Sequence, residues 1–408
     1  MPNKDKNIPK RRFKAFENAD AWELRKLGEL GTVAMCRRIF KEQTSEIGEI
    51  PFYKIGTFGG TPDAFISKEL FEEYRNKYSY PTKGDILISA SGSIGRTVEF
   101  LGKDEYFQDS NIVWLKHDGK IDNIFLKQFY SIVKWSGVEG STIKRLYNEN
   151  ILNTEIVLPT LPEQEAIGTF FSTLDQQITL HQRKLDKLKH VKQAYLSEMF
   201  PAEGERVPKR RFPGFTDAWE LRPLGEIGNT YTGLSGKTKD DFGHGDGRFV
   251  TYMNVFSNPI SLPEMVEAVE IDESQNTVRY GDVLFTTSSE TPEEVGMSSV
   301  WLGNTENTYL NSFCFGFRPV KKVNPYYLAY LLRSSGMRRK ISFLAQGISR
   351  YNISKTKMME LEISIPNENE QSAIGTFFST LDQQITLHQR KLEKLKNLKK
   401  ALLNELFV

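Results

Sequence analysis

The sequence predicts an α+β protein in which two globular domains, each with a mixed, largely antiparallel sheet and helices, are separated by two long antiparallel coiled-coil helices. Three observations predict this architecture. Residues 163–189 return as residues 370–396 with 25 of 27 positions identical. A shorter block precedes each of two less similar segments of about 120 to 140 residues. Apolar residues in the long block follow a heptad pattern, so we expect paired helices and an internal pseudo-two-fold repeat.

The shorter block reads Pro-Lys-Arg-Arg-Phe at residues 9–13 and 208–212, and Trp-Glu-Leu-Arg follows at 22–25 and 219–222. With this block as A, the long block as B and the inserts as X and Y, the order is A-X-B-A-Y-B. Duplication of a structural domain would let blocks and inserts diverge alike. Their uneven divergence favours an assembly role for the blocks and separate recognition roles for the inserts. The predicted recognition domains are residues 1–159 and 204–366, and the predicted helices are residues 160–203 and 367–408.

Each insert is predicted to combine short strands with a helix. In X, β-rich runs at 51–57, 85–89 and 112–115 are expected to be strands, and residues 125–134 a helix. The counterpart of this helix in Y is residues 326–339. Gly-Asp pairs at 84–85 and 281–282 mark the same point in both inserts. We therefore read X and Y as one fold with two different surfaces.

Each copy of block B is predicted to be a helix of about 40 residues, roughly 60 Å long. Thr160 and Asn367 are the expected N-caps, and a glutamate three residues later completes a capping-box pattern. Antiparallel pairing is favoured because each block A could then close against the far end of the opposite helix. Parallel pairing, and packing of each helix on its own domain, are the alternatives. The residues expected to pack along the helices are Ile167, Phe171, Leu174, Ile178, Leu185, Leu188, Ile374, Phe378, Leu381, Ile385, Leu392 and Leu395.

Composition limits the class of protein. The 408 residues are 39% hydrophobic and 26% charged, as in a folded soluble chain. No apolar run approaches the roughly 18 residues of a membrane helix, and the polar N-terminus argues against a secretory signal. Cys36 and Cys314 alone cannot build a disulfide framework, so a cytoplasmic location is expected. The formal net charge of +2 gives no indication of nucleic acid.

Catalytic patterns are not found in the sequence. The segment Gly236-Lys237-Thr238 lacks the preceding glycine of a phosphate-binding loop. Residues 324–327, Asn-Pro-Tyr-Tyr, lack the second proline of the motif of amino-methylating enzymes and read as a helix start. His181 and His388 lie on the helix seam and are expected to pack there, not to bind metal. We therefore expect a non-catalytic chain with no metal and no cofactor of its own.

Basic and polar clusters nevertheless recur at matching places in the two halves. Both copies of block A are basic, and a second cluster opens each insert. Lysine, arginine and hydroxyl groups suit phosphate contacts, and arginine also reads base edges. A solvated loop is the alternative for each cluster taken singly. The residues predicted to bind DNA are Arg37, Arg38, Lys41, Ser91, Ser93, Arg96, Lys144, Arg145, Lys237, Lys239, Thr287, Ser288, Ser349 and Arg350.

These features resemble the specificity (S) subunit family of type I restriction-modification systems, over essentially the whole chain. The resemblance rests on the A-X-B-A-Y-B order and on Trp-Glu-Leu-Arg-x-Leu-Gly-Glu at Trp22 and Trp219. It also rests on Gly-Asp-(Ile/Val)-Leu after Lys83 and Tyr280, and on Glu-Gln-x-Ala-Ile-Gly at the start of each long block.

The resemblance implies that X and Y are target recognition domains, each reading one half of a bipartite double-stranded DNA site. The helices would set the spacing and dock two methyltransferase (modification) subunits, through which restriction subunits join. S-adenosylmethionine, ATP and Mg²⁺ would be bound by those partners, and no membrane would be involved. No base-contacting residue can be carried over from the family. The alternatives are a non-catalytic coiled-coil scaffold that binds protein partners through its globular domains, and an enzyme with an unrecognised site.

Overall fold

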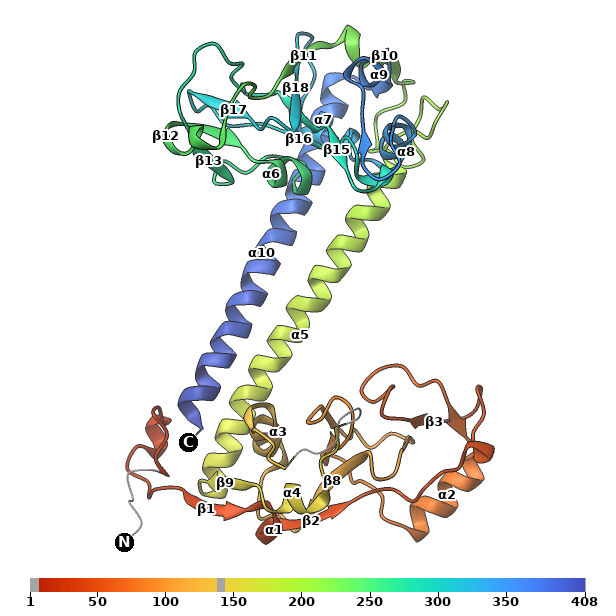
Figure 1. The fold of residues 1–408 in the computed structure, drawn as a ribbon. Helices are drawn as coiled ribbons and strands as arrows, with labels where there is room; N and C mark the ends of the chain where they lie inside the picture. Colours follow the sequence, from red (N-terminus) through yellow and green to blue (C-terminus); the bar gives the residue numbers. More distant parts are fainter. Residues whose placement is uncertain (1–6, 138–143, 408) are drawn as a thin grey trace. The chain divides into compact units, whose positions relative to one another are not determined.

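The computed structural model describes residues 7–137 and 144–407 (Figure 1). The chain forms two compact units: unit 1 is residues 1–182 with 391–408, and unit 2 is residues 183–390. Two long helices, α5 (Leu161–Glu198) and α10 (Glu368–Leu406), each pass from one unit into the other. They contain 38 and 39 residues, so the predicted helix lengths are confirmed.

Unit 1 contains a four-stranded antiparallel sheet in the order β2-β8-β5-β6. A three-stranded sheet places β3 between β4, which is antiparallel to it, and β7, which is parallel. A separate pair, β1 with β9, joins the two ends of the insert. The strands are β1 (Glu23–Lys26), β2 (Gly31–Ala34), β3 (Ile50–Tyr53), β4 (Phe65–Ile66), β5 (Ile86–Ser89), β6 (Thr97–Glu99), β7 (Tyr106–Phe107), β8 (Ile112–His117) and β9 (Glu155–Leu158). The helices are η2 (Lys14–Phe16), α1 (Leu27–Leu30), η3 (Lys41–Gln43), α2 (Lys68–Lys77), α3 (Asn123–Ile132) and α4 (Asn148–Leu152).

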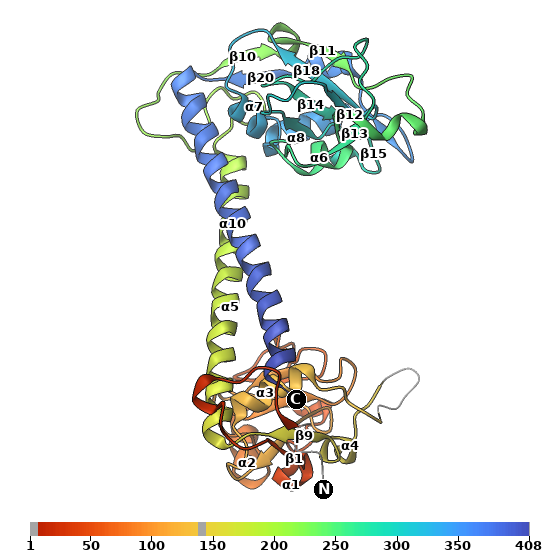
Figure 2. The same cartoon turned by 90° about the vertical axis from the view of Figure 1, so that its left-hand side faces the viewer.

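Unit 2 repeats this topology, with sheets β11-β18-β14-β16 and β13-β12-β17 and the pair β10-β20 (Figure 2). It adds a short pair, β15-β19. The strands are β10 (Glu220–Pro223), β11 (Gly228–Thr232), β12 (Phe242–Val250), β13 (Val266–Val269), β14 (Val283–Thr286), β15 (Ser288–Ser289), β16 (Ser298–Val300), β17 (Thr308–Leu310), β18 (Cys314–Pro319), β19 (Tyr351–Asn352) and β20 (Glu362–Ile365). The helices are η4 (Leu224–Glu226), η5 (Lys239–Asp241), α6 (Tyr252–Ser257), η6 (Pro292–Glu294), α7 (Pro325–Leu331), α8 (Ser335–Phe343) and α9 (Lys355–Met359). The predicted α+β class and the single fold for both inserts are confirmed.

The helix predicted over residues 326–339 is two helices, α7 and α8. The Ser334 hydroxyl caps α8 by accepting a hydrogen bond from the Met337 amide. Between the helices, the Arg333 guanidinium turns inward and donates to four carbonyls, those of Val255, Phe256, Asn258 and Ser298. Its burial lowers the pKa of Arg333 to about 9. The break therefore follows from long-range contacts that the helical pattern does not contain.

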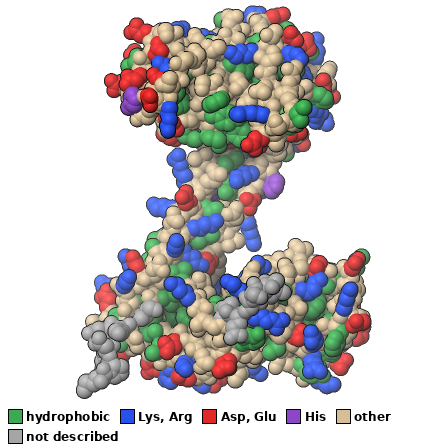
Figure 3. Space-filling view, viewed as in Figure 1, with side chains coloured by type: hydrophobic (Ala, Val, Ile, Leu, Met, Phe, Trp, Pro, Cys, Tyr) green, Lys and Arg blue, Asp and Glu red, His purple; other side chains and the backbone are tan. Residues whose placement is uncertain are grey.

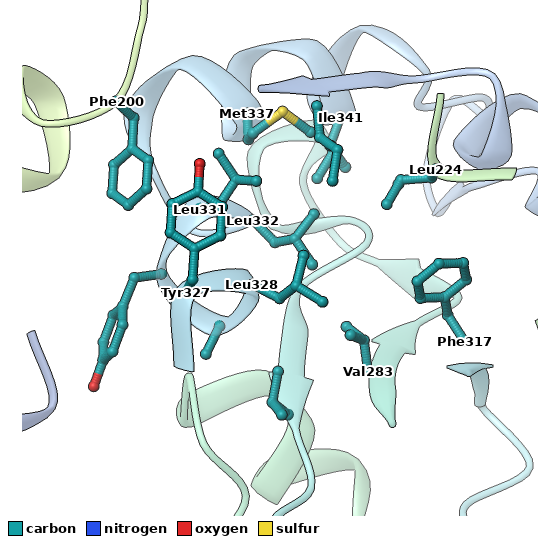
Figure 4. Packing of buried hydrophobic residues seen from close by; sticks show 14 of the residues in the cluster. Phe200, Leu224, Val283, Phe317, Tyr327, Leu328, Leu331, Leu332, Met337 and Ile341 are labelled. Carbon is teal, nitrogen blue, oxygen red and sulfur yellow. The ribbon is translucent and has the colours of Figure 1, made fainter. Parts of the chain in front are cut away.

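The core of unit 2 lies between its main sheet and the long helices. Figure 4 shows Tyr327, Leu328 and Leu331 of α7 among the buried side chains, with Phe200 on one side and Val283 of β14 on the other. All five are at most 4% exposed. The apolar faces of α7 thus connect the sheet to the end of α5. In unit 1, α3 has the same place, and its Phe125 stacks on Phe407 at 4.9 Å.

The repeated Glu-Gln-x-Ala-Ile-Gly segments fix the start of each long helix to the insert. In unit 1, the Gln164 side chain donates to the Pro159 carbonyl and accepts from the Asp122 amide, both at 2.9 Å. Gln371 makes the same two contacts in unit 2, with Pro366 and Asn324. A Cβ at Gly168 would come within 2.9 Å of the Phe125 amide nitrogen, so this close approach requires glycine.

Within each unit, the segments of α5 and α10 pair antiparallel, as predicted. In unit 1, Asp175 of α5 accepts hydrogen bonds from Lys399 of α10 at 2.6 and 2.8 Å. In unit 2, Asp382 of α10 accepts from Lys192 of α5, and the Tyr195 ring packs against Phe377 at 5.0 Å. Buried seam residues are Ile167, Phe171, Leu174, Leu185, Ile374, Phe378 and Leu392, and half-buried ones are Ile178, Leu188, Leu381, Ile385 and Leu395. His181 is also buried. Among the described residues, no helix is suited to crossing a membrane.

Candidate nucleic-acid interface

Three polar segments of unit 1 meet at one edge of its four-stranded sheet. Both β2 and β5 are antiparallel to β8, so the ends of β2 and β5 lie beside the start of β8. The Ala90 amide, just after β5, donates to the Asn111 carbonyl, just before β8, at 2.7 Å. The Ser91 hydroxyl, which is buried, donates to the Asn111 side chain at 2.7 Å. The loop after β5 is therefore held against the turn before β8.

A fourth segment joins this edge from the end of the insert. Ser91 and Arg145 form an isolated antiparallel bridge, and the Gly92 amide donates to the Lys144 carbonyl at 3.2 Å. The side chains of Lys144 and Arg145 are exposed, as are those of Ser93 and Arg96. The structure therefore brings five predicted residues together in loops with fixed backbones and exposed basic side chains.

The predicted residues after β2 lie near the same edge. Arg37, Arg38 and Lys41 are exposed. The Arg38 guanidinium is 3.8 Å from the Asp109 carboxylate, in the turn before β8. The guanidinium of Arg37 lies over the Tyr78 ring, 5.2 Å from its centre. Asp109 and Asn111 were not among the predicted residues, although both are polar and precede the β-rich run at 112–115.

The equivalent edge of unit 2 is built in the same way around the turn before β18. The Leu234 amide, after β11, donates to the Leu310 carbonyl at 2.8 Å. Thr287, after β14, donates to the Phe313 carbonyl through both its amide and its hydroxyl, at 3.0 and 2.8 Å. Ser288 is buried and pairs with Asn352 in β15-β19, which brings the segment containing Ser349 and Arg350 to this edge.

The predicted residues of unit 2 differ in how freely their side chains are presented. Ser349, Arg350 and Lys239 are exposed. The Lys237 ammonium is paired with the Asp272 carboxylate at 2.8 Å, and only 12% of its side chain is exposed. This hydrogen bond raises the pKa of Lys237 and lowers the pKa of Asp272. Lys237 therefore fixes its own loop in this structure. The DNA-binding role of all these residues stays a prediction.

The arginines of block A bind carboxylates of the long helices, contrary to their proposed place on a basic surface. Arg12 donates to both Glu163 oxygens at 2.7 Å, and the two side chains are 8% and 1% exposed. Arg211 makes the same contact with Glu370, at 2.6 and 2.7 Å. This contact raises the pKa of Arg211. The glutamates thus accept from guanidinium groups, which differs from their predicted capping-box role, whereas Asn367 does cap α10 by accepting from the Glu370 amide at 2.9 Å.

A second arginine of each block A reaches the C-terminal end of the other helix. Arg11 pairs with Glu405 at 2.7 Å, and Arg210 pairs with Glu198 at 2.6 Å. Each block A thus closes against one helix start and one helix end within its own unit, as the antiparallel prediction required. On the face of each unit that Figure 3 draws, basic side chains are interspersed with acidic ones. In residues 7–137 and 144–407, no three His, Cys, Asp or Glu side chains are placed to hold a metal ion.

Comparison with known proteins gives a family match to most of the chain. The sequence model of the type I restriction modification DNA specificity domain matches residues 19–190 and 216–397. A solved structure of a type I restriction-modification S subunit from M. genitalium has a TM-score of 0.58 at 16% identity, covering 98% of this chain and 99% of that one. This second likeness concerns the fold alone.

Three curated relatives have related names. A putative type I restriction enzyme specificity subunit of Haemophilus influenzae, S.HindORF215P, is 58% identical over 157 residues, which is 38% of this chain and 41% of the relative. The putative MjaX specificity subunit of Methanocaldococcus jannaschii is 27% identical over 50% of this chain and 48% of its own length. The MjaVIII specificity subunit of the same organism is 23% identical over 84% of this chain and 82% of its own. The chain thus spans less than half the length of the first two relatives.

Proposed function

Because the chain belongs to the type I restriction modification DNA specificity family, we propose that it is the sequence-reading subunit of a type I restriction-modification complex. Each unit reads one half of a bipartite duplex site. One observation carries this proposal: in both units, matching loops meet at the same edge of a sheet of the same topology, yet the side chains they present differ. Two domains that read different DNA sequences can share one fold if the side chains at the sheet edge differ, as they do here.

The chemistry of these edges supports the reading of DNA. Exposed Arg38 and Arg145 in unit 1, and Arg350 in unit 2, supply guanidinium groups that can contact phosphates or guanine edges. The Arg96 guanidinium donates to the Phe58 carbonyl at 2.9 Å and would have to exchange this contact. Their loops are held by backbone hydrogen bonds, so little ordering is needed on binding. The small net charge of +2 is compatible with this role, because exposed basic residues gather at these edges and partner subunits would add their own charge.

We further propose that the long helices dock two copies of one methyltransferase subunit. Four exposed residues in the N-terminal half of each helix are identical in the two copies, although packing does not constrain them. In unit 1 they are Thr173, Gln176, Gln177 and Leu180, and in unit 2 they are Thr380, Gln383, Gln384 and Leu387. Two identical helix surfaces can each bind one copy of the same subunit. In this proposal the chain is non-catalytic and cytoplasmic, S-adenosylmethionine, ATP and Mg²⁺ belong to the partners, and restriction subunits join through them.

Substitution of the two exposed leucines tests this docking. Leu180 and Leu387 are 50% and 57% exposed. We expect the Leu180→Asp variant to bind one methyltransferase copy. The double variant with Leu387→Asp should bind none at concentrations tenfold above the wild-type Kd. In each case the reason is that a carboxylate would be buried at the contact. Native mass spectrometry counts the copies. Leu398→Asp is the control and should still bind two copies, since Leu398 is 45% exposed but has no leucine counterpart in the first copy. Two bound copies in the double variant would contradict the proposal.

The proposed function itself is tested by mapping methylated adenines in cells that carry or lack this chain. We expect a bipartite methylated sequence that disappears with the chain. Binding of duplex DNA by the purified chain with its methyltransferase partner should be specific and should weaken with salt. If no DNA affinity appears even with the partner, the chain is a protein-binding scaffold. Methylation or cleavage by the isolated chain would contradict its non-catalytic role.

A further inference from the structure

A short hairpin follows α8 in unit 2, and its backbone is fixed at both ends. Gln346 and Asn352 exchange two backbone hydrogen bonds, at 2.9 and 2.8 Å. Gly347 has a φ of +139°, and a Cβ there would lie 2.0 Å from the Arg350 carbonyl oxygen, so the turn requires glycine. The return strand β19 pairs with β15, which anchors the hairpin to the loop after β14. The conformation of the tip is therefore set by the fold.

The tip carries an apolar side chain that the protein does not cover. Ile348 is 95% exposed, and no other large hydrophobic among the described residues is more exposed. Contact with another apolar group would remove this side chain from water, which favours binding. Single exposed apolar residues are common on proteins, so exposure alone indicates little. The position of Ile348, on a fixed tip at the proposed DNA-reading edge, is what distinguishes it.

Polar groups suited to base edges surround this tip. Ser349 and Arg350 follow Ile348 and line a hollow of about 440 Å³, together with Tyr252, Ser289 and Glu290. Arginine recognises guanine and glutamate accepts from the cytosine amino group, whereas carboxylates repel phosphates. The presence of Glu290 therefore favours a base edge over the sugar-phosphate backbone as the group that approaches here. In the major groove, the feature that distinguishes thymine is its methyl group, which needs an apolar contact.

We infer that Ile348 is a specificity residue that contacts the 5-methyl group of a thymine in the major groove of the half-site read by unit 2. A two-stranded β-ribbon fits this groove, and the hairpin of residues 346–352 presents Ile348 at the end of such a ribbon. The inference rests on the proposed function, because it takes duplex DNA as the ligand. It adds the residue, the base and the chemical group that are recognised.

Replacement of thymine by uracil tests the contact directly, because the two bases differ only in this methyl group. Once the half-site is known from methylation mapping, each of its thymines is replaced in turn, and binding by the complete complex with methyltransferase subunits is measured. We expect one position at which uracil weakens wild-type binding about fourfold, the effect of one methyl group no longer removed from water. The Ile348→Ala complex should bind the thymine and uracil duplexes equally.

Three matched variants act as controls. Ile47 of unit 1 is 88% exposed but lies between Glu46 and Glu49, so Ile47→Ala should retain the fourfold preference. Phe313, 57% exposed beside the loop after β14, and Met253, 54% exposed in the same hollow as Ser349 and Arg350, are two other apolar candidates at this edge. Phe313→Ala and Met253→Ala should both retain the preference. Thermal unfolding verifies that each variant is folded.

The outcomes separate this inference from the proposed function. A uracil effect that persists in Ile348→Ala, or that is lost in Phe313→Ala or Met253→Ala, overturns the role of Ile348. Specific binding by the wild type that is insensitive to every uracil substitution also overturns it and leaves the proposed function intact. If the wild-type complex binds no duplex specifically, the proposed function fails and the inference fails with it.

Discussion

Exchange of residues 31–153 of unit 1 for the matching segment of another specificity subunit is expected to change one half of the methylated sequence completely and to leave the other half unchanged. The segment begins after α1 and ends before β9, so the β1-β9 pair and the block A contacts with α5 and α10 are retained. Unit 2 contains none of the exchanged residues. Sequencing of methylated adenines gives both halves of the site in one experiment.

The reciprocal exchange of residues 228–360 in unit 2 is the matched control and should change only the other half. This segment lies between η4 and β20, at the same points of the fold. The number of unspecified bases between the halves should stay the same in both chimaeras, because both long helices are retained. A change in both half-sites after either exchange would show that the two readers are not independent.

Replacement of Glu370 by alanine is expected to destabilise unit 2 by roughly 3 to 5 kcal/mol, because the largely buried Arg211 guanidinium would lose its carboxylate partner and keep only the Asp217 carbonyl. Glu370 is fully buried, the Arg211 side chain is 11% exposed, and the Trp219 indole also donates to Glu370 at 3.2 Å. For a unit of about 200 residues this loss corresponds to a fall in Tm of roughly 10 °C. Differential scanning calorimetry of the whole chain measures it.

The control for this prediction is Glu405→Ala. Its pair with Arg11 is equally short, but the two side chains are 37% and 61% exposed. Exposed pairs typically contribute less than about 1 kcal/mol, so the Tm should shift little. Glu163→Ala should behave like Glu370→Ala, because Glu163 pairs with Arg12 in the same buried manner. Equal effects of the Glu370 and Glu405 substitutions would contradict the importance of burial.

The elements that the sequence predicted well are those with local or repeated signals. The near-identical repeat and its heptad spacing were sufficient to predict both long helices, and the recurring block A favoured their antiparallel pairing. Predicted strands near residues 51–57, 85–89 and 112–115 correspond to β3, β5 and β8, with bounds shifted by a few residues. In these strands the apolar runs become buried, so sequence pattern and tertiary structure agree.

The features that could not be predicted depend on partners distant in sequence. In the sequence, Arg12 and Arg211 resemble phosphate-binding residues. In the structure, each pairs with a glutamate that lies 151 or 159 residues away in the chain. Lys237 likewise pairs with Asp272 across two different loops. Ile348 was not among the residues predicted to bind DNA, because only basic and hydroxyl side chains were selected. Its exposure depends on the tight turn at Gly347, which the sequence pattern does not reveal.

The helix-to-helix ion pairs have a consequence for how such a protein can evolve. In unit 1 an aspartate of α5 binds a lysine of α10, and in unit 2 the roles of the helices are exchanged. A substitution at any one of these positions therefore affects the stability of only one half, although its twin in the other half is identical. Compensating changes can accumulate in one unit without disturbing the ion pair of the other. The helix contacts of one unit can thus change by compensating substitutions while those of the other unit stay as they are.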